Sequence, residues 1–237
     1  MDTDRIIVAI GGGEIKLKST ALIDRYIADL TKARAGDNKP KALFFPTASH
    51  DSFRYFNAFR KTYSSDMQFK LDIALLAKCD ITIEHIQEKI EVADLIYIGS
   101  GDTPYMVDLW HERGIDKLIL EAYNRGTIIA GISAGANVWF DKYHSDIDVR
   151  ASGLSNYSIH PGLGIIKGIV CPHFNIHRDS FLNVVSDTNC SPAYGISNNS
   201  ALVFRNEMLV GSIGYPSYVY FQDDYDNKLY RVNPITY

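Results

Sequence analysis

A serine flanked by glycines lies near the middle of the chain, where an apolar stretch gives way to small residues. Gly131-Ile132-Ser133-Ala134-Gly135 follows a run of apolar, mostly β-branched residues that starts at Thr127. This is the G-x-S-x-G pattern of a nucleophile elbow, whose glycines lack the Cβ atoms that would clash in a sharp turn from strand to helix. We therefore predict a strand ending at Ala130, a helix beginning near Ala134, and a nucleophilic Ser133 exposed between them. The alternative is that this segment is only a tight turn of small residues, without a catalytic role.

Residues that can activate this serine follow it in the sequence. A serine hydroxyl is a poor nucleophile at neutral pH, so it needs a base to take its proton and an acid to orient that base. His173 lies forty residues after the serine and ends another apolar run, while Asp146 and Asp148 lie thirteen and fifteen residues after it. The order Ser, Asp, His predicts a catalytic triad. His160 and His177 are alternative bases, but neither follows a predicted strand as His173 does.

A glycine-rich segment at 99–103 follows another predicted strand, at 94–98. An oxyanion hole needs backbone N–H groups about 3 Å from the developing negative charge, and glycine lets the main chain approach that closely. We predict the N–H groups of Gly101 and Ala134 as the donors. The alternative is a simple turn in which Asp102 or Thr103 caps the next helix, and both interpretations are compatible.

A second glycine run, at 11–13, matches the pattern of a phosphate-binding loop only in part. Lys16 occupies the last glycine position of Gly-x-Gly-x-x-Gly, and no Gly-Lys-Ser/Thr follows. We predict a tight connection near the carboxyl edge of the sheet instead of a nucleotide site. No cofactor and no metal site are expected.

The elements that position these residues alternate between strand and helix. Apolar runs predict strands at 6–10, 41–45, 68–74, 94–98, 127–130 and 165–170, and helical patterns lie at 20–35, 83–90, 103–112, 115–125 and 179–186. A helix capped by Asp51 carries aromatic residues at 53–63, which we assign to the core or an interface. Residues 141–164 predict a loop, and short runs from 194 onward predict a C-terminal β meander. The alternation predicts an α/β fold with a doubly wound, mostly parallel sheet, whose ligand site lies at the carboxyl ends of the strands.

Length and composition narrow the possible functions. The 237 residues fit a single domain, 1–237, with a substantial core. A formal net charge of −4, without a dense cluster of Lys or Arg, predicts neither nucleic acid nor a membrane surface as partner. Three widely spaced cysteines suit a reducing compartment, and no signal peptide or membrane-spanning run is evident. We therefore expect a cytoplasmic protein with a small ligand.

Together these motifs resemble peptidase family S51, the group of dipeptidase E and cyanophycinase. The segments that carry the resemblance are Ile98–Thr103, Gly131–Asn137 and Pro172-His173-Phe174, supported by Phe45–Ser49 and Tyr194–Ile196, and the likeness covers about residues 5–205. The resemblance implies a fold similar to class I glutamine amidotransferases, a three-layer sandwich. It also implies a cofactor-free serine peptidase, often a homodimer, which in the dipeptidase branch removes an N-terminal aspartate from Asp-X dipeptides.

The resemblance also implies roles for individual residues. Ser133 takes the place of the nucleophile, His173 that of the base, and the donors are again Gly101 and Ala134. Counting residues from Ser133 without gaps favours Asp148 as the acid. The local Ser145-Asp146 pattern is closer to the acid-bearing segment of the family, so we slightly prefer Asp146.

The chain departs from the dipeptidases at a residue that helps to bind the substrate. In the dipeptidases an arginine after the Pro-His segment helps to hold the aspartate of the substrate, and Arg178 is the corresponding candidate, since a guanidinium can grip a carboxylate with two hydrogen bonds. The spacing in the family is longer, and His177-Arg178-Asp179 does not reproduce its pattern. The chain therefore resembles uncharacterised members more than dipeptidase E itself.

Two other functions remain open from the sequence. An esterase of the α/β-hydrolase type shares the elbow and the residue order, but its oxyanion loop often carries His-Gly-Gly-Gly and its histidine lies nearer the C-terminus. A binding or regulatory protein that keeps the fold without catalysis is the other alternative, favoured by the departures around Arg178.

Overall fold

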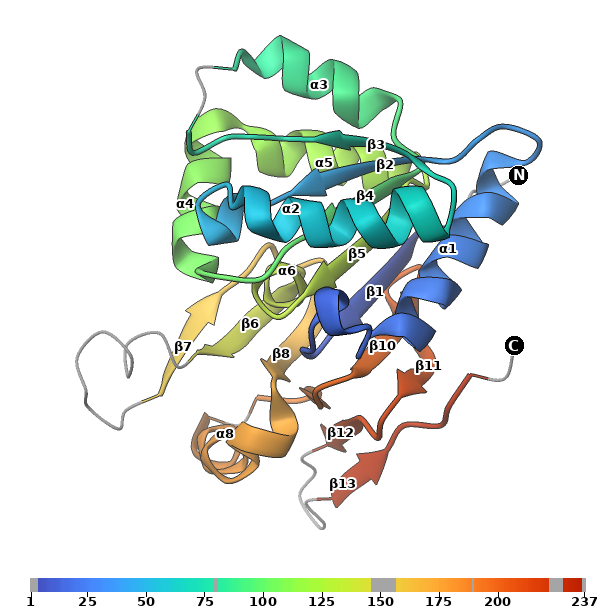
Figure 1. The fold of residues 1–237 in the computed structure, drawn as a ribbon. Helices are drawn as coiled ribbons and strands as arrows, with labels where there is room; N and C mark the ends of the chain where they lie inside the picture. Colours follow the sequence, from blue (N-terminus) through green and yellow to red (C-terminus); the bar gives the residue numbers. More distant parts are fainter. Residues whose placement is uncertain (1–3, 79–80, 146–156, 189, 222–227, 236–237) are drawn as a thin grey trace.

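The computed structural model of the chain describes residues 4–78, 81–145, 157–188, 190–221 and 228–235 (Figure 1). Its strands form two sheets, one of seven strands and one of six. The sequence predicts one doubly wound, mostly parallel sheet, and this prediction is incomplete because the structure contains a second sheet.

The first sheet has the order β11-β10-β1-β5-β4-β2-β3. Its parallel strands are β1 (Ile6–Ile10), β2 (Lys41–Phe45), β3 (Lys70–Ile73), β4 (Leu95–Ile98) and β5 (Ile128–Ile132), and the antiparallel strands β10 (Ser200–Arg205) and β11 (Met208–Gly214) extend it beyond β1. Ile10 is paired with Ile132, and Ile98 with Gly131. The ends of β1, β4 and β5 therefore meet at one edge of the sheet.

Helices cover both faces of this sheet, as a parallel sheet requires. On β1, Ile7 and Ala9 point into a core with α3 (Ile83–Glu91), α4 (Thr103–Arg113) and α5 (Ile115–Asn124). Ile6, Val8 and Ile10 point into the opposite core with α1 (Ala21–Ala35), α2 (Phe53–Arg60) and the π-helical turn η3 (Lys61–Asp66). The doubly wound arrangement predicted from strand and helix alternation is present.

The aromatic residues of 53–63 divide between the core and the surface. Phe59 and Tyr63 are buried against Phe44, which confirms a core role for these two. Phe53 is 54% exposed. The cap of α2 is Ser52, whose hydroxyl accepts the N–H of Tyr55, so the expected cap by Asp51 is wrong.

Asp51 has a different role. Its carboxylate accepts the backbone N–H groups of Ala77 and Lys78 at 2.6 and 3.0 Å, and the residue is fully buried. It ties the turn after β2 to the segment that follows β3.

The second sheet has the order β13-β12-β9-β8-β6-β7. Its strands are β6 (Phe140–Ser145), β7 (Ser158–Pro161), β8 (Ile166–Pro172), β9 (Ala193–Ile196), β12 (Tyr218–Phe221) and β13 (Lys228–Arg231). One face joins the core of α3 to α5 through Tyr143, Val170 and Ile196, and the other packs on α8 (Phe174–Thr188) through Cys171 and Phe181. Cys171 is fully buried in this core.

Two predictions about the second half of the chain are wrong. Residues 140–145 and 158–161 form strands where a loop is expected from the sequence, because polar His144 and Ser145 are buried in β6 and break the apolar pattern. The C-terminal strands do not form a meander, since the chain leaves the second sheet after β9, contributes β10 and β11 to the first, and returns at β12. The crossing from β9 to β10 brings 197–199 to the strand ends described above.

Among the helices of the described residues, none has both the length and the apolar character needed to cross a bilayer.

Candidate active site

Ser133 stands at a sharp turn between β5 and the short helix α6 (Ala134–Asn137). Strand β5 runs to Ile132, two residues beyond the predicted end, and the helix begins at Ala134 as expected. A Cβ on Gly131 would lie 1.9 Å from the carbonyl oxygen of Gly135, so a side chain at this first glycine of the motif would prevent the turn. A Cβ on Gly135 would clash in the same way with β4, which lets α6 pack directly on the sheet.

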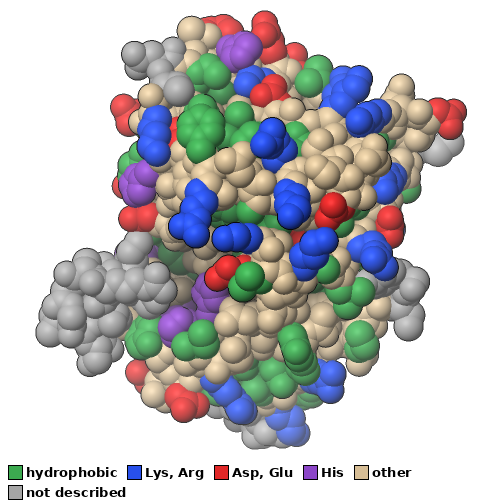
Figure 2. Space-filling view, in the orientation of Figure 1, with side chains coloured by type: hydrophobic (Ala, Val, Ile, Leu, Met, Phe, Trp, Pro, Cys, Tyr) green, Lys and Arg blue, Asp and Glu red, His purple; other side chains and the backbone are tan. Residues whose placement is uncertain are grey.

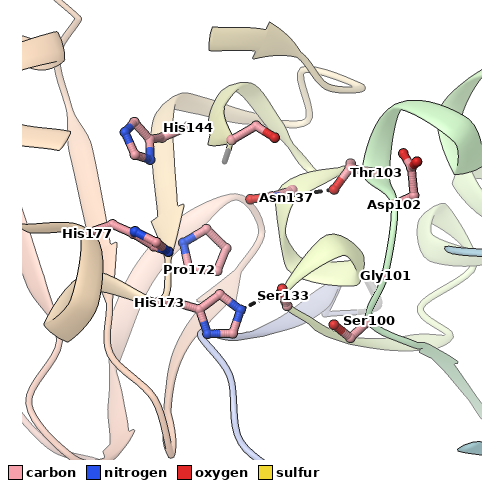
Figure 3. A pocket seen from close by; sticks show the side chains of 11 residues that line it. Ser100, Gly101, Asp102, Thr103, Ser133, Asn137, His144, Pro172, His173 and His177 are labelled. Carbon is pink, nitrogen blue, oxygen red and sulfur yellow. Dashed lines mark hydrogen bonds between the residues drawn. The ribbon is translucent and has the colours of Figure 1, made fainter. Parts of the chain in front are cut away.

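The predicted nucleophile and the predicted base are in contact. The Oγ of Ser133 lies 2.7 Å from the Nε2 of His173, which follows Pro172 at the end of β8 (Figure 3). Both residues have positive φ angles, 54° for Ser133 and 113° for His173. Such backbone conformations cost a non-glycine residue on the order of 1–3 kcal/mol and are concentrated at functional sites. The fold therefore maintains strain at both residues while it brings them together.

The other nitrogen of this histidine is held by an amide, not by one of the predicted carboxylates. The Nδ1 of His173 lies 2.7 Å from the Oδ1 of Asn198, in the loop between β9 and β10. An amide oxygen only accepts hydrogen bonds, so the proton of a neutral ring lies on Nδ1. That tautomer leaves Nε2 free to accept the hydrogen of the Ser133 hydroxyl. Cysteine peptidases of the papain type use asparagine in this position.

The triple glycine at 11–13 supports this pair. A Cβ on Gly12 would lie 2.1 Å from the Oδ1 of Asn198 and 2.4 Å from the Nδ1 of His173. The carbonyl of Gly12 accepts the N–H of Asn199 at 2.9 Å, and the N–H of Asn198 is bonded to the Oδ1 of Asn175 at 2.8 Å. The predicted tight connection at the sheet edge thus packs against the histidine and its partner.

The predicted acids, Asp146 and Asp148, lie outside the described residues. Arg178 is exposed on α8 and does not line the cavity that contains Ser133. Of the alternative bases, His160 lies 2.7 Å from the hydroxyl of Ser158, away from the cavity, whereas His177 lines it.

The two predicted oxyanion donors differ in position, since Gly101 lines the cavity, whereas Ala134 follows Ser133 in the chain and is not among the described residues that line it. Gly101 lines the same cavity as Ser133, and its N–H has no hydrogen-bond partner in the part of the chain that the structure describes. Its φ is 147°, and a Cβ at this position would lie 2.0 Å from the carbonyl oxygen of Ala48, so only glycine fits here. Ala134 is the first residue of α6, so its N–H has no partner within the helix. Both amides remain available to a developing oxyanion.

Asp102 shows that the simpler interpretation of the glycine-rich turn also holds. Its Oδ1 accepts the N–H of Tyr105 at 2.9 Å and caps α4. The same turn therefore starts a helix and presents Gly101 to the site.

Tyr55 connects this turn to α2. The N–H of Ser100 donates to its hydroxyl oxygen at 3.2 Å, and its ring occupies the space beside Gly99, where a Cβ would lie 2.9 Å from Cε1. Burial raises the pKa of Tyr55 above its ordinary value, so the phenol stays neutral and keeps its proton.

The cavity beside Ser133 has a volume of about 420 Å³ and a polar wall (Figure 3). Asn137 donates from Nδ2 to the Oγ1 of Thr103 at 3.2 Å, while its buried Oδ1 has no hydrogen-bond partner among the described residues and points into the cavity. No Lys or Arg is found among the described residues that line it, and Asp102 is the one carboxylate among them. Within the described part of the chain, no cluster of His, Cys, Asp or Glu could hold a metal ion.

Solved structures share the fold. A peptidase from an acI-B1 Actinobacterium superposes with a TM-score of 0.72 at 21% identity, covering 97% of this chain and 95% of that one. A putative peptidase E protein from Listeria monocytogenes EGD-e superposes with a TM-score of 0.63 at 19% identity, covering 90% of this chain and all of that one. At these identities the likeness concerns the fold alone. It supports an α/β architecture with mixed, mostly parallel sheets.

Sequence comparison gives the family. The uncharacterised peptidase YgaJ of Bacillus subtilis strain 168 is 29% identical over 213 residues, which cover 87% of this chain and 86% of YgaJ. The uncharacterised peptidase Lin0382 of Listeria innocua is 27% identical over 176 residues, 70% of this chain and 81% of the relative. The model of peptidase family S51 matches residues 7–210. The resemblance inferred from the motifs is confirmed, and the chain belongs to peptidase family S51, a family of serine-type peptidases.

Proposed function

We propose that the chain hydrolyses a small peptide, with Ser133 as nucleophile and His173 as general base. The observation that carries the proposal is the 2.7 Å contact between the Oγ of Ser133 and the Nε2 of His173. A contact of this length lets the imidazole take the hydroxyl proton as the oxygen attacks. Asn198 orients the imidazole, and the N–H groups of Gly101 and Ala134 stabilise the oxyanion.

The reaction has two halves. The Oγ of Ser133 bonds to the scissile carbonyl carbon while Nε2 of His173 takes its proton, and the carbonyl oxygen becomes an oxyanion. The carbon–nitrogen bond then breaks as His173 gives this proton to the leaving amine, and an ester to Ser133 remains. Water attacks the ester, His173 takes a proton from it and returns one to Oγ, and the acid product leaves. In both halves of the reaction, the imidazole of His173 first accepts a proton and then donates it.

Several features of the cavity support a short peptide as substrate. Its volume of about 420 Å³ is in the range of small-molecule sites. Its described lining is polar, and Ser100, Thr103 and Asn137 are among the residues that can form hydrogen bonds with a peptide. We propose a dipeptide and retain Asp-X dipeptides among the candidates, although Arg178 lies outside the cavity. A homodimer in the cytoplasm remains our proposal for the state of the protein.

A substrate panel tests the proposal. Purified protein is incubated with dipeptides of all side-chain classes, including Asp-X, and with p-nitrophenyl esters, and released amino acids or nitrophenol are quantified. We expect cleavage of at least one dipeptide class, no cleavage by Ser133→Ala, and an unchanged melting profile for that variant. Hydrolysis of esters alone would favour the esterase, and full activity of Ser133→Ala would rule out this nucleophile.

A further inference from the structure

A second hollow adjoins the cavity on the other side of the glycine-rich turn. It has a volume of about 490 Å³ and lies between the 3₁₀ turn η1 (Ile15–Leu17) and the first turns of α2. Ser100 lines both hollows, and Gly13 lines the second one. The two hollows therefore meet next to the predicted oxyanion donor Gly101.

The two hollows differ in charge. Lys16 and Arg54 line the second hollow, whereas the cavity beside Ser133 has no Lys or Arg among its described lining residues. Both cations are exposed, and among the described residues neither forms an ion pair. Nearby Lys18, in contrast, is paired with Asp66 at 3.1 Å. Glu14 is the one acidic residue described at the second hollow, so two unpaired cations face one carboxylate there.

The surface view agrees with this division. On the face shown in Figure 2, Lys and Arg side chains gather over α2 and α1, close to the histidines at the mouth of the cavity. These Lys and Arg side chains gather there although the chain as a whole has a formal net charge of −4.

The position of the turn relates the hollows to the reaction. A carbonyl carbon attacked by Ser133, with its oxygen at the N–H of Gly101, would lie close to Ser100, which lines both hollows. The side chain of Ser100 lies next to Ser133 in the close-up view (Figure 3). A substrate attacked by Ser133 can therefore extend past Ser100 toward the hollow that Lys16 and Arg54 line.

We infer that the second hollow is a subsite for a carboxylate of the substrate, held by Arg54 and Lys16. Arg54 supplies the planar, two-pronged donor that suits a carboxylate, and Lys16 adds a second positive charge. The inference rests on the proposed peptidase function and gives the cationic role to α2 and η1 in place of Arg178. Two sources of the carboxylate share this chemistry: the C-terminus of a dipeptide and an acidic side chain.

The test compares matched substrates on matched variants. For a dipeptide that the wild type cleaves, kcat and KM are measured for the free acid, for the C-terminal amide, and for an amide with aspartate as its second residue. The variants are Arg54→Ala, Lys16→Ala and the double variant. Arg60→Ala is the control, because Arg60 is exposed on the same helix and lines neither hollow.

We expect each single variant to lower kcat/KM for the free acid about 10-fold, through KM, as the loss of one charge-assisted hydrogen bond predicts. The double variant should cleave acid and amide at similar rates. Its rate of labelling by a fluorophosphonate, which carries no carboxylate, should match that of the wild type and of Arg60→Ala. In the wild type, faster cleavage of the aspartyl amide than of the plain amide would identify the side chain as the source of the carboxylate. Equal cleavage of the two amides, both slower than the free acid, would identify the C-terminus.

Two results would overturn the inference, and they are distinguishable. If the wild type cleaves peptides but prefers neither the free acid nor the aspartyl amide over the plain amide, the subsite is wrong and the peptidase function stands. The same holds if the double variant keeps the full preference of the wild type. If the wild type neither cleaves a peptide nor reacts with the fluorophosphonate, the proposed function fails and the subsite with it.

Discussion

Replacing Asn198 with alanine should slow peptide hydrolysis by about 10- to 100-fold. The bond to be removed joins the Nδ1 of His173 and the Oδ1 of Asn198 at 2.7 Å. Between neutral partners such a bond contributes about 1 kcal/mol, but it becomes charge-assisted when His173 is an imidazolium, and bonds to charged groups contribute about 1.5–3 kcal/mol. Since each 1.36 kcal/mol corresponds to a factor of ten in rate, a loss of about 1.4–2.7 kcal/mol in the transition state gives this range.

Three further variants make the prediction specific. Asn198→Asp keeps an acceptor at the same place and should preserve activity, because a carboxylate accepts the Nδ1 hydrogen as the amide oxygen does. Asp146→Asn and Asp148→Asn replace the acids expected from the sequence and should have little effect if Asn198 alone orients the base.

The assay is kcat on a cleaved dipeptide at saturating substrate, with thermal melting to verify that each variant is folded. Full activity of Asn198→Ala, together with a loss of about 10²-fold or more in either aspartate variant, would refute the assignment of Asn198 and restore the carboxylate triad. Loss of activity in Asn198→Asp as well as in Asn198→Ala would indicate that the site needs an amide, which the orienting role alone does not predict.

Three more predictions concern stability and the support of the site. Burial raises the pKa of Asp24 from 3.8 to about 6, so the folded state binds more protons than the unfolded chain between about pH 4 and 6, and the free energy of unfolding falls as the pH rises through that window. Asp24→Asn should remove this pH-dependent loss of stability, which amounts to up to about 3 kcal/mol. Urea titrations should therefore find the variant more stable than the wild type at pH 7.5 and little changed at pH 4. An equal difference in the free energy of unfolding at both pH values would contradict the reasoning. Gly12→Ala should lower kcat more than 10-fold, because its Cβ would displace Asn198 and His173, and a rate equal to that of the wild type would show that the loop yields without consequence. Ser133→Gly should be inactive but about 1 kcal/mol more stable than Ser133→Ala, since glycine adopts a φ of 54° without strain; equal stabilities would argue against strain at the elbow.

The proposed nucleophile and the proposed base can be recognised in the sequence for a physical reason. Each follows a buried strand whose apolar run ends at the residue concerned, and parallel strand ends collect at one edge of a sheet. The glycines of the elbow are required by contacts with backbone atoms, so their spacing is a reliable signal. The sequence therefore identifies Ser133 and His173 as candidates one by one, but their contact needs the structure, because β5 belongs to the first sheet and β8 to the second.

The orienting residue cannot be found in the same way. Asn198 follows β9, as His173 follows β8, but the sequence pattern places β9 in a meander away from the site. Only the crossing from the second sheet to the first carries the Asn198 loop to the end of β1. A search restricted to carboxylates also passes over an amide, although the short strand Ala193–Ile196 followed by two asparagines is a usable signal.

Strands at β8, β9, β12 and β13 are expected from the sequence, but their assembly into a second sheet is not, because β6 and β7 fall in the predicted loop. Strand β6 buries Tyr143, His144 and Ser145 in succession, so neither alternation nor a purely apolar run identifies it. The cationic hollow escapes prediction for another reason, since Lys16 and Arg54 are far apart in the chain and meet only through the packing of η1 on α2.

Covalent labelling with a fluorophosphonate tests the central claim, that Ser133 is a nucleophile activated by His173, independently of the substrate. Intact mass spectrometry gives the stoichiometry, and peptide mapping gives the labelled residue. The account predicts one label per chain, on Ser133, absent in Ser133→Ala and formed much more slowly in His173→Ala. Absence of labelling in the folded wild type, or a label on another residue, would contradict it.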